Sequence, residues 1–71
     1  MFSVRLNQLL DERNISAYRL AKDTEIPERL VGYWKKGEKL PGLEKLIVIA
    51  DYFNVSIDYL AGRTDKPEVN E

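Results

Sequence analysis

The chain has 71 residues, of which 44% are hydrophobic and 32% are charged, and its formal net charge is −1. This balance predicts a single globular domain and argues against a disordered chain or a non-specific nucleic-acid coat protein, which would be clearly basic. Cysteine and histidine are absent, which excludes a disulfide framework and a thiolate or imidazole metal site, and removes the commonest general base. No apolar run reaches the roughly 18 residues of a membrane span. No signal peptide opens the chain, so we expect a cytoplasmic protein.

The charges are distributed unevenly along the chain. Residues 26–46 carry five basic and three acidic side chains, a net charge of +2, whereas residues 47–71 carry two basic and five acidic side chains, a net charge of −3. A local positive patch can steer a polyanion even when the whole chain is close to neutral.

Apolar residues recur at helical spacing and no segment has the pattern of a strand, which predicts an all-α fold. We expect a first helix over residues 3–13 that ends at Asn14, a residue type that tolerates the left-handed conformation of a helix end. Ser16 is expected to cap a second helix, because its hydroxyl can accept a hydrogen bond from an unpaired backbone N–H. The connection to the third helix, Glu25 and Ile26, is so short that it predicts a helix-turn-helix.

The third helix is expected to hold Pro27 in its first turn, where the missing N–H costs nothing, and to end at Gly37. Leu30, Val31 and Trp34 fall on one face of it. A large aromatic four residues from a buried position belongs to the core far more often than to a ligand platform. We therefore expect Trp34 to be buried.

A fourth helix is expected to begin near Gly42 and to end at Asn54. Ser56 should cap a short fifth helix that Gly62 closes. The residues of the fourth helix that we expect to face the core are Leu43, Leu46, Ile47, Ala50 and Phe53.

These elements predict one five-helix domain over residues 1–63, followed by a polar, flexible C-terminal tail over residues 64–71. The chain has no Gly-rich phosphate loop and no pair of carboxylates that converges on one helical face. We therefore expect no enzymatic activity and no catalytic residue, no metal or other cofactor, and no small-molecule ligand.

The stretch ISAYRLAKDTEIPERLVGYWKKGEKLPGLEKLIVIADYFNVSIDYLAGRTD resembles the Cro/CI-type helix-turn-helix family of phage repressors, also called the XRE family. The residues that match the family pattern are Ser16, Leu20, Ala21, Ile26, Val31, Trp34, Gly37 and Pro41. The resemblance implies a compact five-helix fold like that of the lambda repressor, with the second and third helices forming the helix-turn-helix.

Several positions depart from the family pattern. Ala17 replaces a glutamine that contacts DNA, and Glu25 replaces the glycine of the turn. Leu10 and Lys35 stand where the family pairs an arginine with a glutamate. Because both partners are gone together, no unpaired charge is left behind.

By the same resemblance, the third helix enters the major groove of DNA. The residues at its base-reading positions are Glu28, Arg29, Gly32 and Tyr33. The residues expected to contact phosphate are Arg19, Lys36 and Lys39, together with the backbone at Gly42 and Leu43, where a helix N-terminus favours an anion. The alternative for both sets is a solvated polar surface.

The leading hypothesis is a sequence-specific DNA-binding transcriptional regulator, in particular a repressor. It would bind a double-stranded operator as a homodimer that is weak in solution. The candidates for a dimer face are Tyr52, Val55, Ile57 and Tyr59, whose alternative role is to cover the edge of the core. The alternative function is a protein-interaction or antitoxin-like module with weak or no DNA binding, which the net acidity, Ala17 and Glu28 favour.

Overall fold

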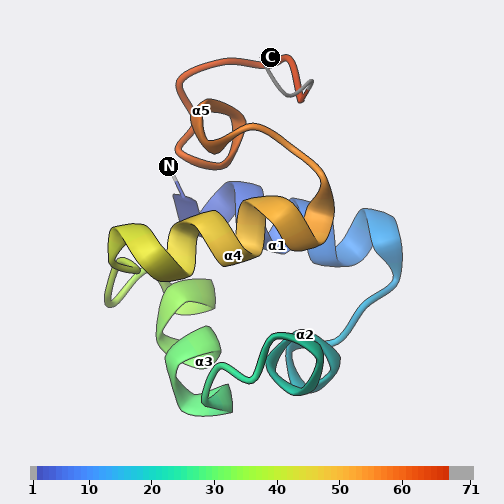
Figure 1. Ribbon diagram of the computed structural model, residues 1–71, viewed down its shortest axis with the longest axis vertical. Helices are drawn as coiled ribbons and strands as arrows, with labels where there is room; N and C mark the ends of the chain where they lie inside the picture. The colour runs from blue at the N-terminus through green and yellow to red at the C-terminus, as the bar shows by residue number, and fades with distance from the viewer. Residues whose placement is uncertain (1, 68–71) are drawn as a thin grey trace.

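A computed structural model describes residues 2–67, and over these residues the chain is helical, without strands (Figure 1). Its helices are α1 (Phe2–Arg13), α2 (Ala17–Thr24), α3 (Glu28–Lys36), α4 (Leu43–Phe53) and α5 (Ile57–Leu60). The prediction of an all-α, five-helix fold is confirmed. No helix of this described part is long and apolar enough to cross a membrane.

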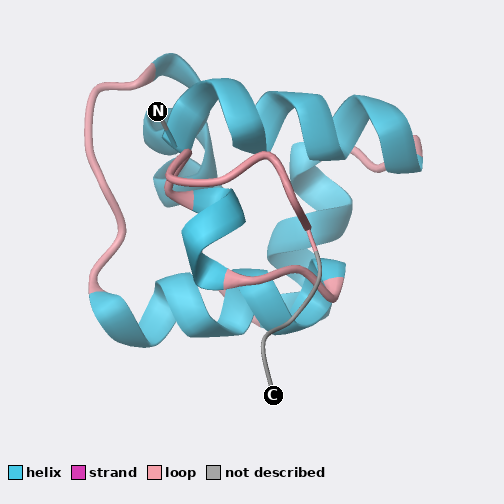
Figure 2. Cartoon of the chain, turned by 90° about the horizontal axis from the view of Figure 1, so that it is seen from above, coloured by secondary structure: helices cyan, strands magenta, loops and turns pink. Residues whose placement is uncertain are grey.

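The helices form three levels in Figure 1, with α2 and α3 below, α1 and α4 in the middle, and α5 above. Seen from above, α1 and α4 run along opposite sides of the molecule and α5 lies between them (Figure 2). The contacts agree with this arrangement, because α5 packs on both α1 and α4 while α3 packs on α1 and α2. Arg13 joins the ends of α1 and α4, since its Nη2 donates to the carbonyl of Phe53 at 2.9 Å.

The helix ends lie at the capping residues that local chemistry predicts. Ser16 and Ser56 each accept, through the side-chain hydroxyl, a hydrogen bond of 3.0 Å from the backbone N–H three residues later. Asn14 and Asn54 end α1 and α4 with φ of 55° and 57°, and Gly37 ends α3 with φ of 76°. These are the left-handed conformations expected of helix C-terminal ends.

The core contains the aromatic residue of α3. Trp34 is only 1% exposed, which confirms that it is a core residue. The ring of Phe2 meets it edge to face, with centroids 6.2 Å apart. Burial of such an aromatic side chain is among the largest single contributions to the stability of a small domain. The largest fully buried side chains are Trp34, Phe53, Leu6, Leu9, Leu20, Ile49, Leu60 and Val31.

The inward face of α4 differs from the prediction. Leu43 and Ile47 are 68% and 40% exposed, whereas Ile49, which was not predicted to face the core, is fully buried together with Phe53. The physical reason is that α4 is apolar on most of its circumference, so its sequence fits more than one helical register. Packing against the other helices selects the stripe that carries Ile49.

The segment after α5 folds back onto the helices. Arg5 Nη2 donates to the carbonyl of Thr64 at 3.4 Å, and the backbone N–H of Ser56 donates to the carbonyl of Pro67 at 3.0 Å. The tail expected from residue 64 therefore makes contacts up to Pro67, and its residues 68–71 lie outside the described part of the chain.

Candidate nucleic-acid interface

The connection between α2 and α3 is a tight turn with one left-handed residue. Glu25 has φ of 61°, the conformation that the family glycine would adopt without strain and that costs another residue about 1–2 kcal/mol. Ile26 is 6% exposed and anchors the turn in the core. Pro27 is the residue before α3 rather than part of its first turn as predicted, and its carbonyl accepts from the N–H of Leu30 at 3.0 Å.

Helix α3 has two distinct faces. Val31 and Trp34 are buried against the other helices. The residues predicted to read bases lie on the outer side, with Glu28 and Arg29 exposed and Gly32 and Tyr33 half-buried. The structure thus brings the four predicted base-reading residues onto one short helix, and the helix displays them away from the core.

A shallow hollow borders the outer side of α3. It has a volume of about 360 Å³, and its described lining includes Ala17 at the start of α2 together with Gly32 and Lys36. Apart from its chain neighbours and the backbone of its own helix, a Cβ added at Gly32 would meet no atom within 4 Å among the described residues. Crowding within the chain therefore does not require this glycine, which leaves room for a molecule to approach α3 from outside.

Arg19, the predicted phosphate contact on α2, is part of a small hydrogen-bond cluster. Its Nε donates to Asp23 Oδ2 at 2.9 Å, and the hydroxyl of Tyr52 donates to the same oxygen at 2.6 Å. The hydrogen bond from Tyr52, followed by that from Arg19, holds the pKa of Asp23 below its ordinary value. The Arg19 side chain remains 67% exposed, so it is oriented by Asp23 and still accessible to an anion.

The other predicted phosphate contacts lie at the end of α3, in the loop that follows it and at the start of α4. Lys36 and Lys39 are exposed, as are Gly42 and Leu43. No side chain caps the N-terminus of α4. Its first backbone N–H groups, which have no partner within the helix, are therefore left to solvent or to an external anion.

The structure divides the four predicted dimer candidates into buried and exposed residues. Val55 and Tyr59 are 4% and 6% exposed, because they pack into the core. The hydroxyl of Tyr52 is committed to Asp23. Of the four candidates, Ile57 is an exposed hydrophobic residue, whereas Val55 and Tyr59 take the alternative role of covering the core.

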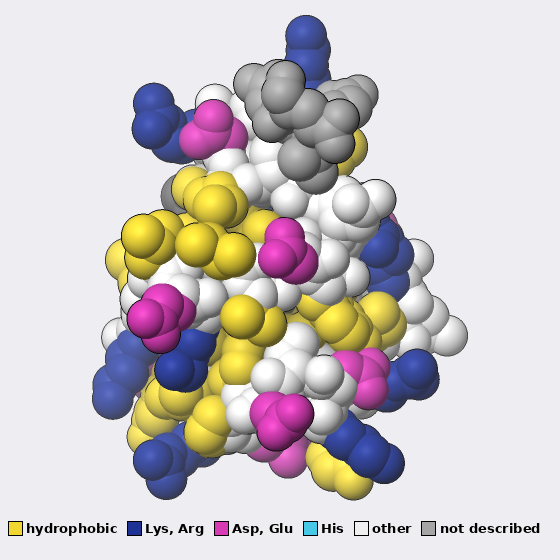
Figure 3. All heavy atoms as spheres, in the orientation of Figure 1, with side chains coloured by type: hydrophobic (Ala, Val, Ile, Leu, Met, Phe, Trp, Pro, Cys, Tyr) yellow, Lys and Arg dark blue, Asp and Glu magenta, His cyan; other side chains and the backbone are white. Residues whose placement is uncertain are grey.

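An apolar surface that the prediction missed lies beside Ile57. We define the α4 apolar surface as Leu43, Ile47 and Ile57, which are 68%, 40% and 38% exposed. Leu43 and Ile47 are one helical turn apart, and Ile47 and Ile57 line one hollow. Figure 3 shows hydrophobic side chains gathered over α4 and toward α5. Leu43 and Ile47 were missed because they were assigned to the core, whereas Ile57 was among the predicted dimer candidates.

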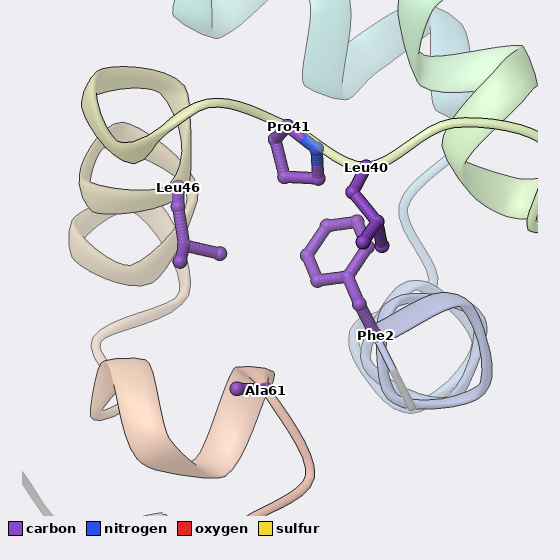
Figure 4. A pocket seen from close by; sticks show the side chains of 5 residues that line it. All are labelled: Phe2, Leu40, Pro41, Leu46 and Ala61. Carbon is purple, nitrogen blue, oxygen red and sulfur yellow. The ribbon is translucent and has the colours of Figure 1, made fainter.

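Another hollow lies between the loop before α4, α4 itself, the start of α1 and the end of α5 (Figure 4). Its volume is about 310 Å³, and its described lining is Phe2, Leu40, Pro41, Leu46 and Ala61. No charged side chain is among these lining residues, so the hollow is apolar like the α4 apolar surface.

Two further residues near α3 were not predicted. Tyr18 is 61% exposed on α2 and lines a hollow with Lys22 and Glu28. A large aromatic on the polar side of a short amphipathic helix was the signal that could have identified it. Asn7 Nδ2 donates to the carbonyl of Lys35 at 2.9 Å. This bond ties α1 to the end of α3 at the position where the family ion pair is missing.

A short helix, a three-residue turn and a second short helix with a polar outer face define the molecule as a helix-turn-helix domain. Residues 5–66 match the family model described as the Cro/C1-type HTH DNA-binding domain, and the chain belongs to this family. The resemblance seen in the sequence is confirmed, and the chain is of the class that carries a Cro/C1-type helix-turn-helix DNA-binding domain.

The chain is similar to longer regulators. It is 34% identical over 68 residues to the uncharacterized HTH-type transcriptional regulator YobD of Bacillus subtilis (strain 168), a match that covers 96% of this chain and 61% of that protein. It is 30% identical over 59 residues to the HTH-type transcriptional activator BcrR of Enterococcus faecalis, covering 83% of this chain and 29% of that protein. The crystal structure of a transcriptional regulator from Listeria innocua matches with a TM-score of 0.78 and 34% identity, covering 100% of this chain and 62% of that one. The chain therefore spans less than two thirds of each of these proteins.

Proposed function

We propose that the protein binds a specific duplex DNA sequence by placing α3 in the major groove, and that it regulates transcription from there. One observation carries the proposal. Glu28 and Arg29, both exposed in the first turn of α3, form no side-chain hydrogen bond or ion pair with any residue between 2 and 67. Two opposite charges displayed side by side and left unpaired are suited to an external ligand that carries both donors and acceptors, as base edges do.

The two residues have different chemical roles in this proposal. Arg29 presents two parallel N–H donors that match the O6 and N7 acceptors of guanine. Glu28 can accept a hydrogen bond from the N4 amino group of cytosine. Gly32 leaves space beside them, and Tyr33 contacts a thymine methyl group or a phosphate.

Phosphate contacts would orient the helix in the groove. Arg19, Lys36 and Lys39 supply positive side chains, and the uncapped N-terminus of α4 at Gly42 and Leu43 supplies backbone N–H groups. Such contacts carry no sequence information, but they fix the register of a reading helix.

A second copy of the chain would occupy an adjacent half-site. The α4 apolar surface is the face through which we propose that the two copies meet. The surface is small, so the dimer would be weak in solution and completed on DNA. We propose that the protein represses transcription by occupying a promoter. A reporter assay tests this, and increased expression would instead indicate activation.

The second candidate function is a protein-interaction module of the antitoxin-like kind. The exposed α4 apolar surface favours it, as does Ala17, which lacks the side chain with which family members contact DNA.

Selection of bound sequences from a pool of random duplexes tests the proposal and separates the two candidates. A DNA reader enriches one motif with two-fold-related halves spaced about one helical turn, or roughly 10 base pairs, apart. Absence of any enriched motif, together with no duplex binding at low salt, would leave the interaction module as the function.

A further inference from the structure

We propose that Lys39 is a positioning residue for Tyr33, and that it sets base preference through this ring as well as contacting phosphate. The inference rests on the proposed function, because it concerns how the outer side of α3 reads DNA. It joins two residues that belong to different parts of the interface, one at the last turn of α3 and one in the loop that follows.

The main evidence is the position of the Lys39 ammonium over the Tyr33 ring. Lys39 Nζ lies 4.6 Å from the ring centroid. A cation within about 6 Å of an aromatic face is attracted by the negative charge density of the ring. Neither side chain forms a hydrogen bond or an ion pair with another residue of the described part of the chain, so the contact is the specific interaction that orients both.

The backbone holds the two residues in this relation. The N–H of Glu38 donates to the carbonyl of Tyr33 at 3.0 Å, and the N–H of Gly37 donates to the carbonyl of Trp34 at 3.2 Å. The chain therefore turns back over the last turn of α3 immediately before Lys39. Gly37, with φ of 76°, makes this turn possible.

The turn is also packed against α1. A Cβ added at Gly37 would lie 3.3 Å from Ser3 Oγ, which is closer than most real Cβ contacts. The loop is thus held from two sides, by hydrogen bonds to α3 and by contact with α1. Lys39 follows directly on this held turn, which keeps its side chain within reach of the Tyr33 ring.

The contact has two consequences for DNA recognition. One face of the Tyr33 ring is occupied by the ammonium, so a base pair or a phosphate would meet the opposite face, the ring edge or the hydroxyl. The ring is also ordered before DNA arrives, which reduces the entropy lost on binding. Loss of the Lys39 charge should therefore change which base pair is preferred beside Tyr33, and should not only weaken binding to every duplex.

Nuclear magnetic resonance of the free protein tests the contact itself. Ring current should shift the ε-methylene protons of Lys39 upfield of those of Lys36, the matched control on α3. Tyr33→Leu should abolish this shift and Tyr33→Phe should retain it. If Lys39 and Lys36 give the same chemical shift, and Tyr33→Leu moves neither, the contact is absent and the proposal is wrong.

A double-mutant cycle on DNA tests its consequence. Lys39→Gln, Tyr33→Leu and the double variant are compared with the unaltered chain by fluorescence anisotropy on the selected duplex and on duplexes altered at single base pairs. The two changes should be coupled by up to about 5-fold in affinity, because preordering of the ring cannot contribute more than an exposed cation–aromatic pair itself. Lys39→Arg should retain the base preference of the unaltered chain, whereas Lys36→Gln should weaken binding to all duplexes alike.

The outcomes separate this proposal from the proposed function. Independent effects of the two changes, or a Lys39→Gln variant with unchanged base preference, would overturn the positioning role while DNA binding stands. If the unaltered chain bound no duplex even at low salt, the proposed function would fail and the DNA role of the pair with it. The proton shifts of Lys39 would still report whether the contact exists.

Discussion

Helices α3 and α4 both contribute to the core, but they expose opposite kinds of surface. α3 buries Val31 and Trp34 and exposes charged residues such as Arg29. α4 buries its own core stripe and still exposes Leu43 and Ile47. A charged, unpaired face suits a polyanion, whereas an exposed apolar face suits another protein surface. Under the proposed function, DNA binding and self-association therefore have separate locations on this small domain, and substitutions should alter them separately.

The largest expected effect concerns the core that supports the reading helix. Trp34→Ala should lower the free energy of unfolding by about 3–5 kcal/mol, because truncation of a buried aromatic leaves a cavity. Small domains have about 5 kcal/mol in total at the lower end of the range, so the variant should be close to unfolded. Urea denaturation followed by circular dichroism measures this. Val48→Ala, on the exposed side of α4, is the control, and equal midpoints for the two variants would contradict the burial of Trp34.

The second effect tests the charged face of α3. Arg29→Ala should cost about 1–3 kcal/mol in affinity for the preferred duplex and little for a scrambled one, because a bidentate contact to guanine is lost. Lys36→Ala, on the same helix, should weaken both duplexes by similar factors and reduce the salt dependence. Anisotropy titrations at several salt concentrations distinguish the two patterns. The same loss for both variants on both duplexes would mean that α3 does not read bases.

The third effect tests the apolar face of α4. Ile47→Ser should reduce cooperative binding to a duplex with two half-sites by about 1 kcal/mol, typical of an interface residue outside the main hot spots, and leave binding to one half-site unchanged. Val48 is exposed to nearly the same extent, 41% against 40% for Ile47, but lies outside the α4 apolar surface. Val48→Ser is therefore a matched control in gel-shift experiments. If Val48→Ser abolished cooperative binding while Ile47→Ser did not, the proposed location of the dimer face would be wrong.

The smallest effect concerns the cluster that joins α2 to α4. The pKa of Asp23 is lowered from 3.8 by the hydrogen bond from Tyr52 and then by that from Arg19. The stability contributed by this carboxylate is therefore present above pH 3.8 and is lost as the pH falls through its lowered folded-state pKa. Asp23→Asn should reduce the fall in melting temperature on acidification, and Asp51→Asn, at an exposed position on α4, should not. If the melting temperatures of the unaltered protein, Asp23→Asn and Asp51→Asn fell equally on acidification, the stabilising role of the Asp23 carboxylate would be contradicted.

Prediction from sequence succeeded where the cause is local. The caps at Ser16 and Asn54 follow from side-chain chemistry within a few residues, and the two faces of α3 follow from a clear alternation of apolar and charged positions. The exposure of Glu28 and Arg29 is readable for the same reason, because they project from a helix whose inner face is unambiguous, while their role in reading bases stays a prediction.

Prediction failed where the outcome depends on distant parts of the chain. The exposure of Ile47 could not be read from an α4 that is apolar nearly all round. The hydrogen bond of Tyr52 with Asp23 joins residues 29 positions apart. The contact of Lys39 with Tyr33 depends on how a loop turns back over α3, which is set by Gly37 and its packing against α1.

The most direct test of the central claim is a titration of the isotope-labelled protein with a duplex that carries one half-site, followed through backbone amide resonances. One half-site offers no position for a second copy, so the shifts report DNA contact alone. We predict the largest shifts at Glu28, Arg29 and Tyr33 and at the start of α4 around Leu43, with little change at Ile57. Large shifts confined to the α4 apolar surface, with α3 unaffected, would contradict the claim that α3 reads DNA.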